Sequence, residues 1–163
     1  MSVKVKQFTH QRTFNASRDR VFAAFKTAEA LAKWWGPAGA PIDVISLEFK
    51  PGGHFHYRMN GTQIHYGIFH FKSINEPDSI TWVNSFADEK GNIIKPPFEG
   101  IDIPKEMLNQ IEFMERDGRT TLSLTSEPVN ADESEINTFN AMHDSFKMGF
   151  TGTLDQLEEY LAS

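Results

Sequence analysis

Several residue types and patterns are scarce or missing in this sequence of 163 residues. It has no cysteine, which excludes disulfide frameworks, thiolate zinc sites and thiol nucleophiles. Its net charge is −6 and no run of lysine or arginine is long enough to follow a phosphate backbone, so we do not expect nucleic acid as a partner. No stretch approaches the roughly 18 apolar residues of a membrane-spanning helix.

The start of the chain also lacks the continuous apolar segment of a signal peptide, because polar and apolar side chains mix over residues 1–14. We therefore expect a cytoplasmic protein. Aromatic residues are abundant, with fourteen Phe, three Tyr and three Trp, and so many rings need an interior. No repeat or low-complexity segment divides the chain, so residues 1–163 are expected to form one domain.

Hydrophobic periodicity predicts short elements in the first part of the chain. A strand is expected over residues 3–14, followed by a helix capped by Ser17 and a second helix over residues 28–35. Six further strands are expected at residues 42–50, 54–59, 64–74, 80–86, 107–115 and 120–126. Tight turns between them imply antiparallel pairing, and residues 88–105 form the longest loop.

Residues 131–162 are expected to form one long amphipathic helix. Its apolar stripe comprises Ile136, Phe139, Met142, His143, Phe146, Phe150, Leu154, Leu157 and Leu161. A sheet of about seven antiparallel strands twists and curls, so it would wrap around such a helix. The pattern therefore predicts an α+β fold. The mixed stripe suits the lining of a pocket, although aromatic residues at helical spacing are also typical of a solid core.

The chain resembles a known family over nearly its whole length. The segments that carry the resemblance are RVFAAFKTAEALAKWWGPAGAPI, FKPGGHFHYRM, YGIFHFKSINEPDSITW, SFADEKGN, IPKEMLNQIEF and MGFTGTLDQLEEYL. They are similar to bacterial proteins related to the C-terminal domain of the activator of the heat-shock protein 90 ATPase, in the START-like (SRPBCC) superfamily. The resemblance implies a helix-grip (Bet v 1/START-like) fold with a cavity that binds apolar ligands. It does not imply co-chaperone activity, because we expect the chain to lack the activator's N-terminal chaperone-binding domain.

Nine residues are candidates for the wall of such a pocket. They are Trp34, Trp35, Trp82, Phe86, Phe113, Met142, His143, Phe146 and Phe150. Adjacent residues on a helix point about 100° apart, so one of Trp34 and Trp35 is expected to be buried and the other to line the pocket mouth or pack under Pro37. His143 is either a hydrogen-bonded core histidine or a polar contact for the ligand.

Metal and nucleophile chemistry find little support in the sequence. His54 and His56 share one face of a strand and His65 follows on the next, which could bring three imidazoles together. However, Phe55, Tyr57 and Met59 form the apolar face of that strand, which leaves His54, His56 and Arg58 on the solvent face. No serine lies in a nucleophile elbow. We expect no metal and no cofactor.

Three functions fit these patterns. The first is binding of a small lipid-like or aromatic molecule in the cavity between sheet and helix. The second is a cyclase, dehydratase or hydrolase that uses His143 or a pocket tyrosine as acid or base. The third is a protein-interaction role such as chaperone regulation, for which the sequence offers no accessory segment. A monomer and a homodimer are both compatible with the sequence.

Overall fold

The computed structural model describes residues 3–163, which form one sheet and four helices. In chain order the elements are β1 (Phe8–Phe14), α1 (Arg18–Ala23), α2 (Ala28–Trp34), β2 (Ile42–Leu47), β3 (His54–Asn60), β4 (Ile64–Asn75), β5 (Ser79–Ala87), β6 (Ile93–Ile94), β7 (Glu106–Arg116), β8 (Arg119–Val129), α3 (Glu133–Ala141) and α4 (His143–Ala162).

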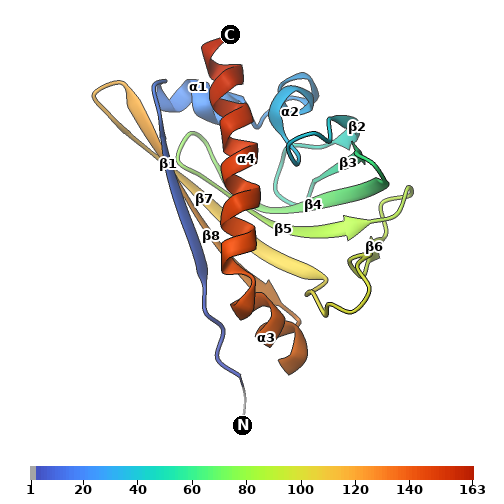
Figure 1. Ribbon diagram of the computed structural model, residues 1–163. Coiled ribbons are helices and arrows are strands. Elements are labelled where there is room, and N and C mark those ends of the chain that lie inside the picture. Colours follow the sequence, from blue (N-terminus) through green and yellow to red (C-terminus); the bar gives the residue numbers. More distant parts are fainter. Residues whose placement is uncertain (1–2) are drawn as a thin grey trace.

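The sheet is antiparallel and wraps around α4 (Figure 1). Its strand order is β1-β8-β7-β5-β4-β3-β2, and the short β6 pairs with β5 in addition. The register shifts between Val44 and Ser46 and between Phe71 and Ser73, and such irregularities bend a sheet. The predicted helix-grip architecture is thereby confirmed, with two short helices after the first strand.

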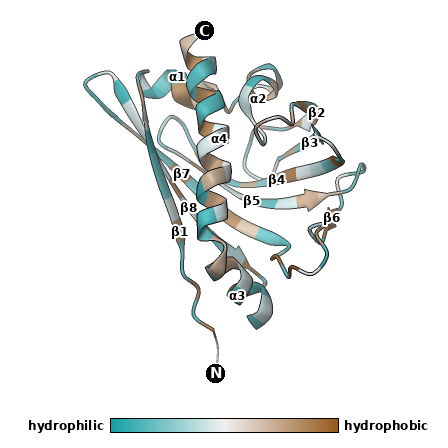
Figure 2. Cartoon of the chain, viewed as in Figure 1, coloured by the Kyte–Doolittle hydropathy of each residue, from teal (hydrophilic) through white to brown (hydrophobic). Residues whose placement is uncertain are grey.

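The concave face of the sheet holds the core. Side chains alternate between the two faces of each strand. Along α4, hydrophilic and hydrophobic residues follow one another in bands (Figure 2). Trp82 of β5 and Phe69 of β4 stack with their ring centroids 4.8 Å apart, and both are buried. Two central strands, β5 and β7, pair so that Trp82 faces Asn109.

The predicted first strand is shorter than expected. It starts at Phe8 instead of residue 3, because the preceding segment is held by a helix and not by a neighbouring strand. The Asn140 side chain of α3 accepts a hydrogen bond from Lys6 N (2.8 Å) and donates one to Lys4 O (2.9 Å). This amide takes over the backbone groups that a strand partner would otherwise satisfy.

The prediction of a single helix over residues 131–162 is also wrong in one respect. The helix is interrupted at Met142, whose φ of −102° and ψ of 11° separate α3 from α4. Asp132 and Glu135 form a capping box at the start of α3. The break changes the direction of the chain (Figure 1) and lets Phe139 reach full burial against Phe146, 5.3 Å away. Within the described residues, no helix has the length and hydropathy to cross a membrane.

One close approach on the concave face requires glycine. Gly67 of β4 lies opposite Tyr57 of β3, and the Tyr57 ring lies over it. A Cβ on Gly67 would lie 2.8 Å from Cε2 of that ring and closer still to its hydroxyl. The ring has little room to move, because Phe55 stacks on it at 4.7 Å and Phe69 meets it edge-on at 6.0 Å.

Substitution of Gly67 therefore tests the packing of this face. We expect Gly67→Ala to lower the free energy of unfolding by about 1–3 kcal/mol, because the added methyl group overpacks the Tyr57 ring. Gly149→Ala in α4 is the matched control: its Cβ meets nothing within 4 Å, and alanine favours a helix by about 0.5–1 kcal/mol. Urea unfolding of the three proteins measures the difference, and equal stability of Gly67→Ala and the unsubstituted protein would contradict the packing described.

Candidate ligand-binding site

The site begins where α4 is joined to the end of α2. Thr153 Oγ1 donates a hydrogen bond to Gly36 O (3.0 Å), and Gln156 Nε2 donates to Trp34 O (2.9 Å) and Gly36 O (2.8 Å). Gly36 has a φ of +110°, and a Cβ there would lie 2.8 Å from Cγ2 of Ile42. The chain therefore turns sharply at a residue that only glycine suits, and α4 satisfies the carbonyl groups of the turn.

This turn separates the two tryptophans as the sequence predicts. Trp34 is 1% exposed, and its Nε1 donates to Ala24 O at 2.8 Å, so it belongs to the core under α1. Trp35 points toward the sheet, where its ring meets Phe69 edge-on at 5.0 Å and Tyr57 at 6.4 Å. One indole is buried and the other lies on a pocket wall.

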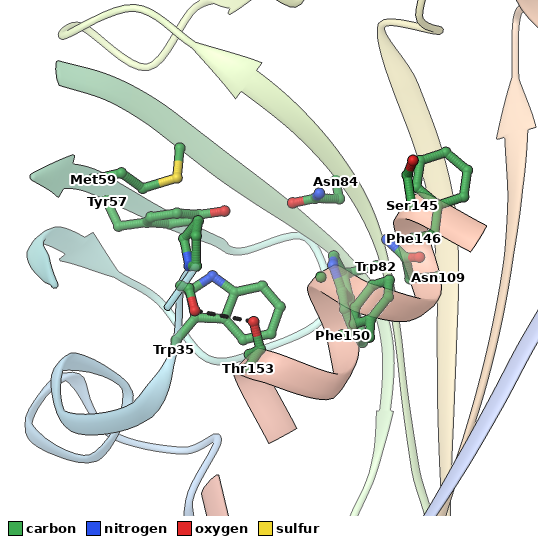
Figure 3. Close-up of a pocket in the computed structure, with 13 residues that line it drawn as sticks. Trp35, Tyr57, Met59, Trp82, Asn84, Asn109, Ser145, Phe146, Phe150 and Thr153 are labelled. Atoms are coloured by element: carbon green, nitrogen blue, oxygen red, sulfur yellow. Dashed lines mark hydrogen bonds between the residues drawn. The ribbon is translucent and has the colours of Figure 1, made fainter. Parts of the chain in front are cut away.

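That pocket is a hollow of about 240 Å³ between the concave face and α4 (Figure 3). We call it the main hollow. Its lining residues are Trp35, Gly36, Pro37, Tyr57, Met59, Trp82, Asn84, Asn109, Ser145, Phe146, Gly149, Phe150 and Thr153. Figure 3 shows Tyr57 and Asn84 pointing toward one another, while Phe146 and Phe150 reach in from α4. Apolar rings dominate the lining, and every residue in it is uncharged.

A second hollow of about 150 Å³ adjoins the first and shares Asn84, Asn109, Phe146 and Phe150 with it. Its other lining residues are Ser85, Phe86, Pro96, Ile103, Pro104, Lys105, Met107 and Ser126. Several of these come from the segment between β6 and β7. The long loop predicted over residues 88–105 therefore forms one wall of this side hollow.

The structure brings together five of the nine candidate residues. Trp35, Trp82, Phe146 and Phe150 line the main hollow, and Phe86 lines the side hollow. The remaining four, Trp34, Phe113, Met142 and His143, line neither.

Two of those four pack elsewhere, Phe113 in the core and His143 at a half-buried position. Phe113 packs edge-on against Phe22 at 5.4 Å, beneath the short helix α1. His143 begins α4 and meets Phe8 at 5.5 Å and Phe139 at 5.1 Å. It shares one stripe of α4 with Phe146 and Phe150, but as the first residue of the helix it lies beyond the end of the hollow.

Two functional candidates that sequence reasoning missed are Asn84 and Asn109. They stand at inward positions of β5 and β7. The neighbouring inward positions, such as Trp82 and Ile111, are apolar. A polar residue in the inward phase of a strand was the available signal. Asn84 Oδ1, Asn109 Oδ1 and Trp82 Nε1 are enclosed by protein atoms, and none of the residues described offers them a hydrogen bond.

Tyr57 contributes the ionisable group of the main hollow. Its burial raises the pKa of the phenol to about 12, and a hydrogen bond with the Trp35 side chain offsets part of this rise. The phenol therefore stays neutral at ordinary pH and can act as a hydrogen-bonding group but not as a charge.

The histidines of β3 and β4 do not form a metal site. His54, His56 and Arg58 share the convex face as predicted, whereas His65 pairs with Met59 and so lies on the concave face. The expectation that His56 faces solvent is wrong: it is 5% exposed, because the loop after β5 covers it and its Nε2 shares a hydrogen bond with Asp88 O (3.0 Å). Across residues 3–163, no three His, Asp or Glu side chains could hold a metal ion.

The pKa of Tyr57 gives a direct test of its burial. A folded-state value above the ordinary 10.0 means that the neutral phenol stabilises the fold. This contribution is complete below pH 10 and is lost as the pH rises toward about 12. We expect the unsubstituted protein to lose about 2–3 kcal/mol of stability over this range relative to Tyr57→Phe.

Phenolate absorbance during an alkaline titration measures the same group independently. The folded protein should show a late-ionising phenol that is absent from Tyr57→Phe. If the substitution instead removed a phenol that ionises near the ordinary pKa of 10.0, solvent would reach Tyr57.

Comparison with known proteins identifies the family. No curated protein matches the chain significantly. Among solved structures, the chain is similar to protein Ms6760 from Mycobacterium smegmatis (22% identity, 98% of this chain and 97% of that chain covered, TM-score 0.77). It is also similar to a protein from Staphylococcus epidermidis (26%, 99% and 92%, 0.78) and to Ara h 8.0201 (15%, 98% and 99%, 0.70).

A family model gives the assignment itself. The model described as activator of Hsp90 ATPase homolog 1-like protein matches residues 15–162, which include every residue of both hollows. The chain therefore belongs to the family of activator of Hsp90 ATPase homolog 1-like proteins.

Proposed function

We propose that the protein binds a small, largely apolar molecule in the main hollow. The observation that carries this proposal is a hollow of about 240 Å³, lined by aromatic rings, between α4 and the concave face of the sheet. Close packing normally fills protein interiors, and the ligand sites of proteins are concave and mostly apolar. The resemblance to START-like proteins points in the same direction.

The dimensions of the hollow suggest the size of the ligand. A cavity of about 150 Å³ lined by aliphatic and aromatic side chains can take up benzene. The main hollow is larger than this, and the side hollow adjoins it. A body of two or three rings, or a branched chain of similar volume, would fit and would bury most of its surface.

The alternative of acid–base catalysis by His143 gains no support from its position. The imidazole lies between Phe8 and Phe139 and lines neither hollow. A general acid or base has to come within hydrogen-bond reach of the substrate. Binding without chemistry is therefore the function that the geometry favours.

The neutral fluorophore N-phenylnaphthylamine provides a direct test. Its fluorescence should rise on mixing with the protein, and Gly149→Leu should weaken its binding by about tenfold or more, because the leucine side chain would occupy part of the hollow. Gly149 lines the main hollow, and nothing lies within 4 Å of the position of its Cβ, so the added side chain begins in open space.

Met148→Leu is the control for this measurement. Met148 is the neighbouring residue of α4 and is 77% exposed, so its substitution should leave binding unchanged. Native mass spectrometry of gently purified protein adds a search for a bound molecule. A protein that arrives empty and gives no thermal shift with a broad library of apolar compounds would contradict the proposal.

A further inference from the structure

The enclosed polar atoms of the main hollow narrow the chemistry of its ligand. We infer that the ligand is uncharged and carries a neutral hydrogen-bonding group, of the hydroxyl or carboxamide kind, on its apolar body. This inference rests on the proposed function and adds to it which molecules the hollow selects.

Three residues with polar side-chain atoms are neighbours on the concave face. Trp82 and Asn109 are directly opposed partners on β5 and β7, and Asn84 follows Trp82 by two residues on the same face of β5. Opposed residues of an antiparallel pair have their Cβ atoms about 4.5–5.5 Å apart. We call this the polar patch, and all three of its residues line the main hollow.

The patch offers both kinds of hydrogen bond. The indole Nε1 of Trp82 can only donate. The Asn109 amide group donates to Met107 O at 3.4 Å, which leaves its Oδ1 as an acceptor, and Asn84 Oδ1 is a second acceptor. A ligand hydroxyl that reaches these atoms can accept from the indole or donate to an amide oxygen, whereas a pure hydrocarbon would leave them unsatisfied.

The hollow offers no partner for a charged ligand. Every residue in the lining of the main hollow is uncharged, and burial keeps the Tyr57 phenol neutral. A carboxylate placed there would lose its water without meeting an opposite charge. In the side hollow the Lys105 ammonium group lies on an exposed residue of the loop, where water screens it.

Three probes with the same bicyclic body separate these features: naphthalene, naphthol and naphthoate. At neutral pH we expect the unsubstituted protein to bind naphthol about tenfold more tightly than naphthalene, and naphthoate at least about tenfold more weakly than naphthol. Equilibrium dialysis measures all three affinities.

Substitution of the polar patch tests its role. Asn84→Leu and Asn109→Leu keep the number and branching of the side-chain heavy atoms and should each reduce the preference for naphthol over naphthalene to within about threefold. They should also raise the Tm of the empty protein by about 2–5 °C, because an enclosed polar atom without a partner is removed. Asn137→Leu, at an exposed position of α3, is the control and should change neither quantity.

The possible outcomes distinguish this inference from the proposed function. Equal binding of naphthalene and naphthol, or an unchanged preference in both asparagine variants, would overturn the inference and leave the binding function standing. Tightest binding of naphthoate, lost in Lys105→Gln, would overturn it in favour of an anionic ligand. Failure of all three probes to bind would overturn the binding function and the inference with it.

Discussion

The placement of α4 is the constraint on which the rest of the structure depends. On one side, Thr153 and Gln156 hold the helix to the turn that follows α2. On the other, Arg12 of β1 forms ion pairs with Asp155 (2.7 Å) and Glu158 (3.3 Å). Strand β1 is one end of the strand order and α2 lies toward the other, so the helix is held across the curve of the sheet (Figure 1). These polar contacts on both sides of α4 fix the distance between the helix and the central strands.

This arrangement explains why a hollow persists beneath the helix. The C-terminal half of α4 packs closely through Leu154, Leu157 and Leu161, which are all buried. Near the N-terminal end of α4 the sheet curves away from the helix. There Phe146 and Phe150 line the hollows without filling them. The residues opposite them, Asn84 and Asn109, occupy positions where leucine would bury apolar surface and leave no enclosed polar atom. An enclosed unsatisfied polar group costs about 1–3 kcal/mol, which is the cost expected for each amide oxygen that stays without a partner.

Local patterns were sufficient to predict the sheet but not the details of the site. Period-two alternation places Phe55, Tyr57 and Met59 on the concave face, and antiparallel strands with tight turns follow from the same signal. The break at Met142 escaped prediction because the apolar stripe continues across it and no proline or glycine lies beside it in the sequence. The burial of His56 likewise depends on a loop from β5 folding over the convex face, a contact that lies 32 residues away in sequence.

The absence of charge from the lining of the main hollow has a further consequence for how it works. Tyr57 is the titratable residue in that lining, and its pKa of about 12 keeps it neutral at ordinary pH. The contacts that a neutral ligand makes there are hydrophobic and hydrogen-bonded, and neither kind depends strongly on ionic strength. Discrimination between ligands must then come from shape and from hydrogen-bond matching at the polar patch. A site of this kind excludes ions because they lose their water without gaining an opposite charge. It distinguishes neutral molecules by how many polar groups of the site each one leaves without a hydrogen bond.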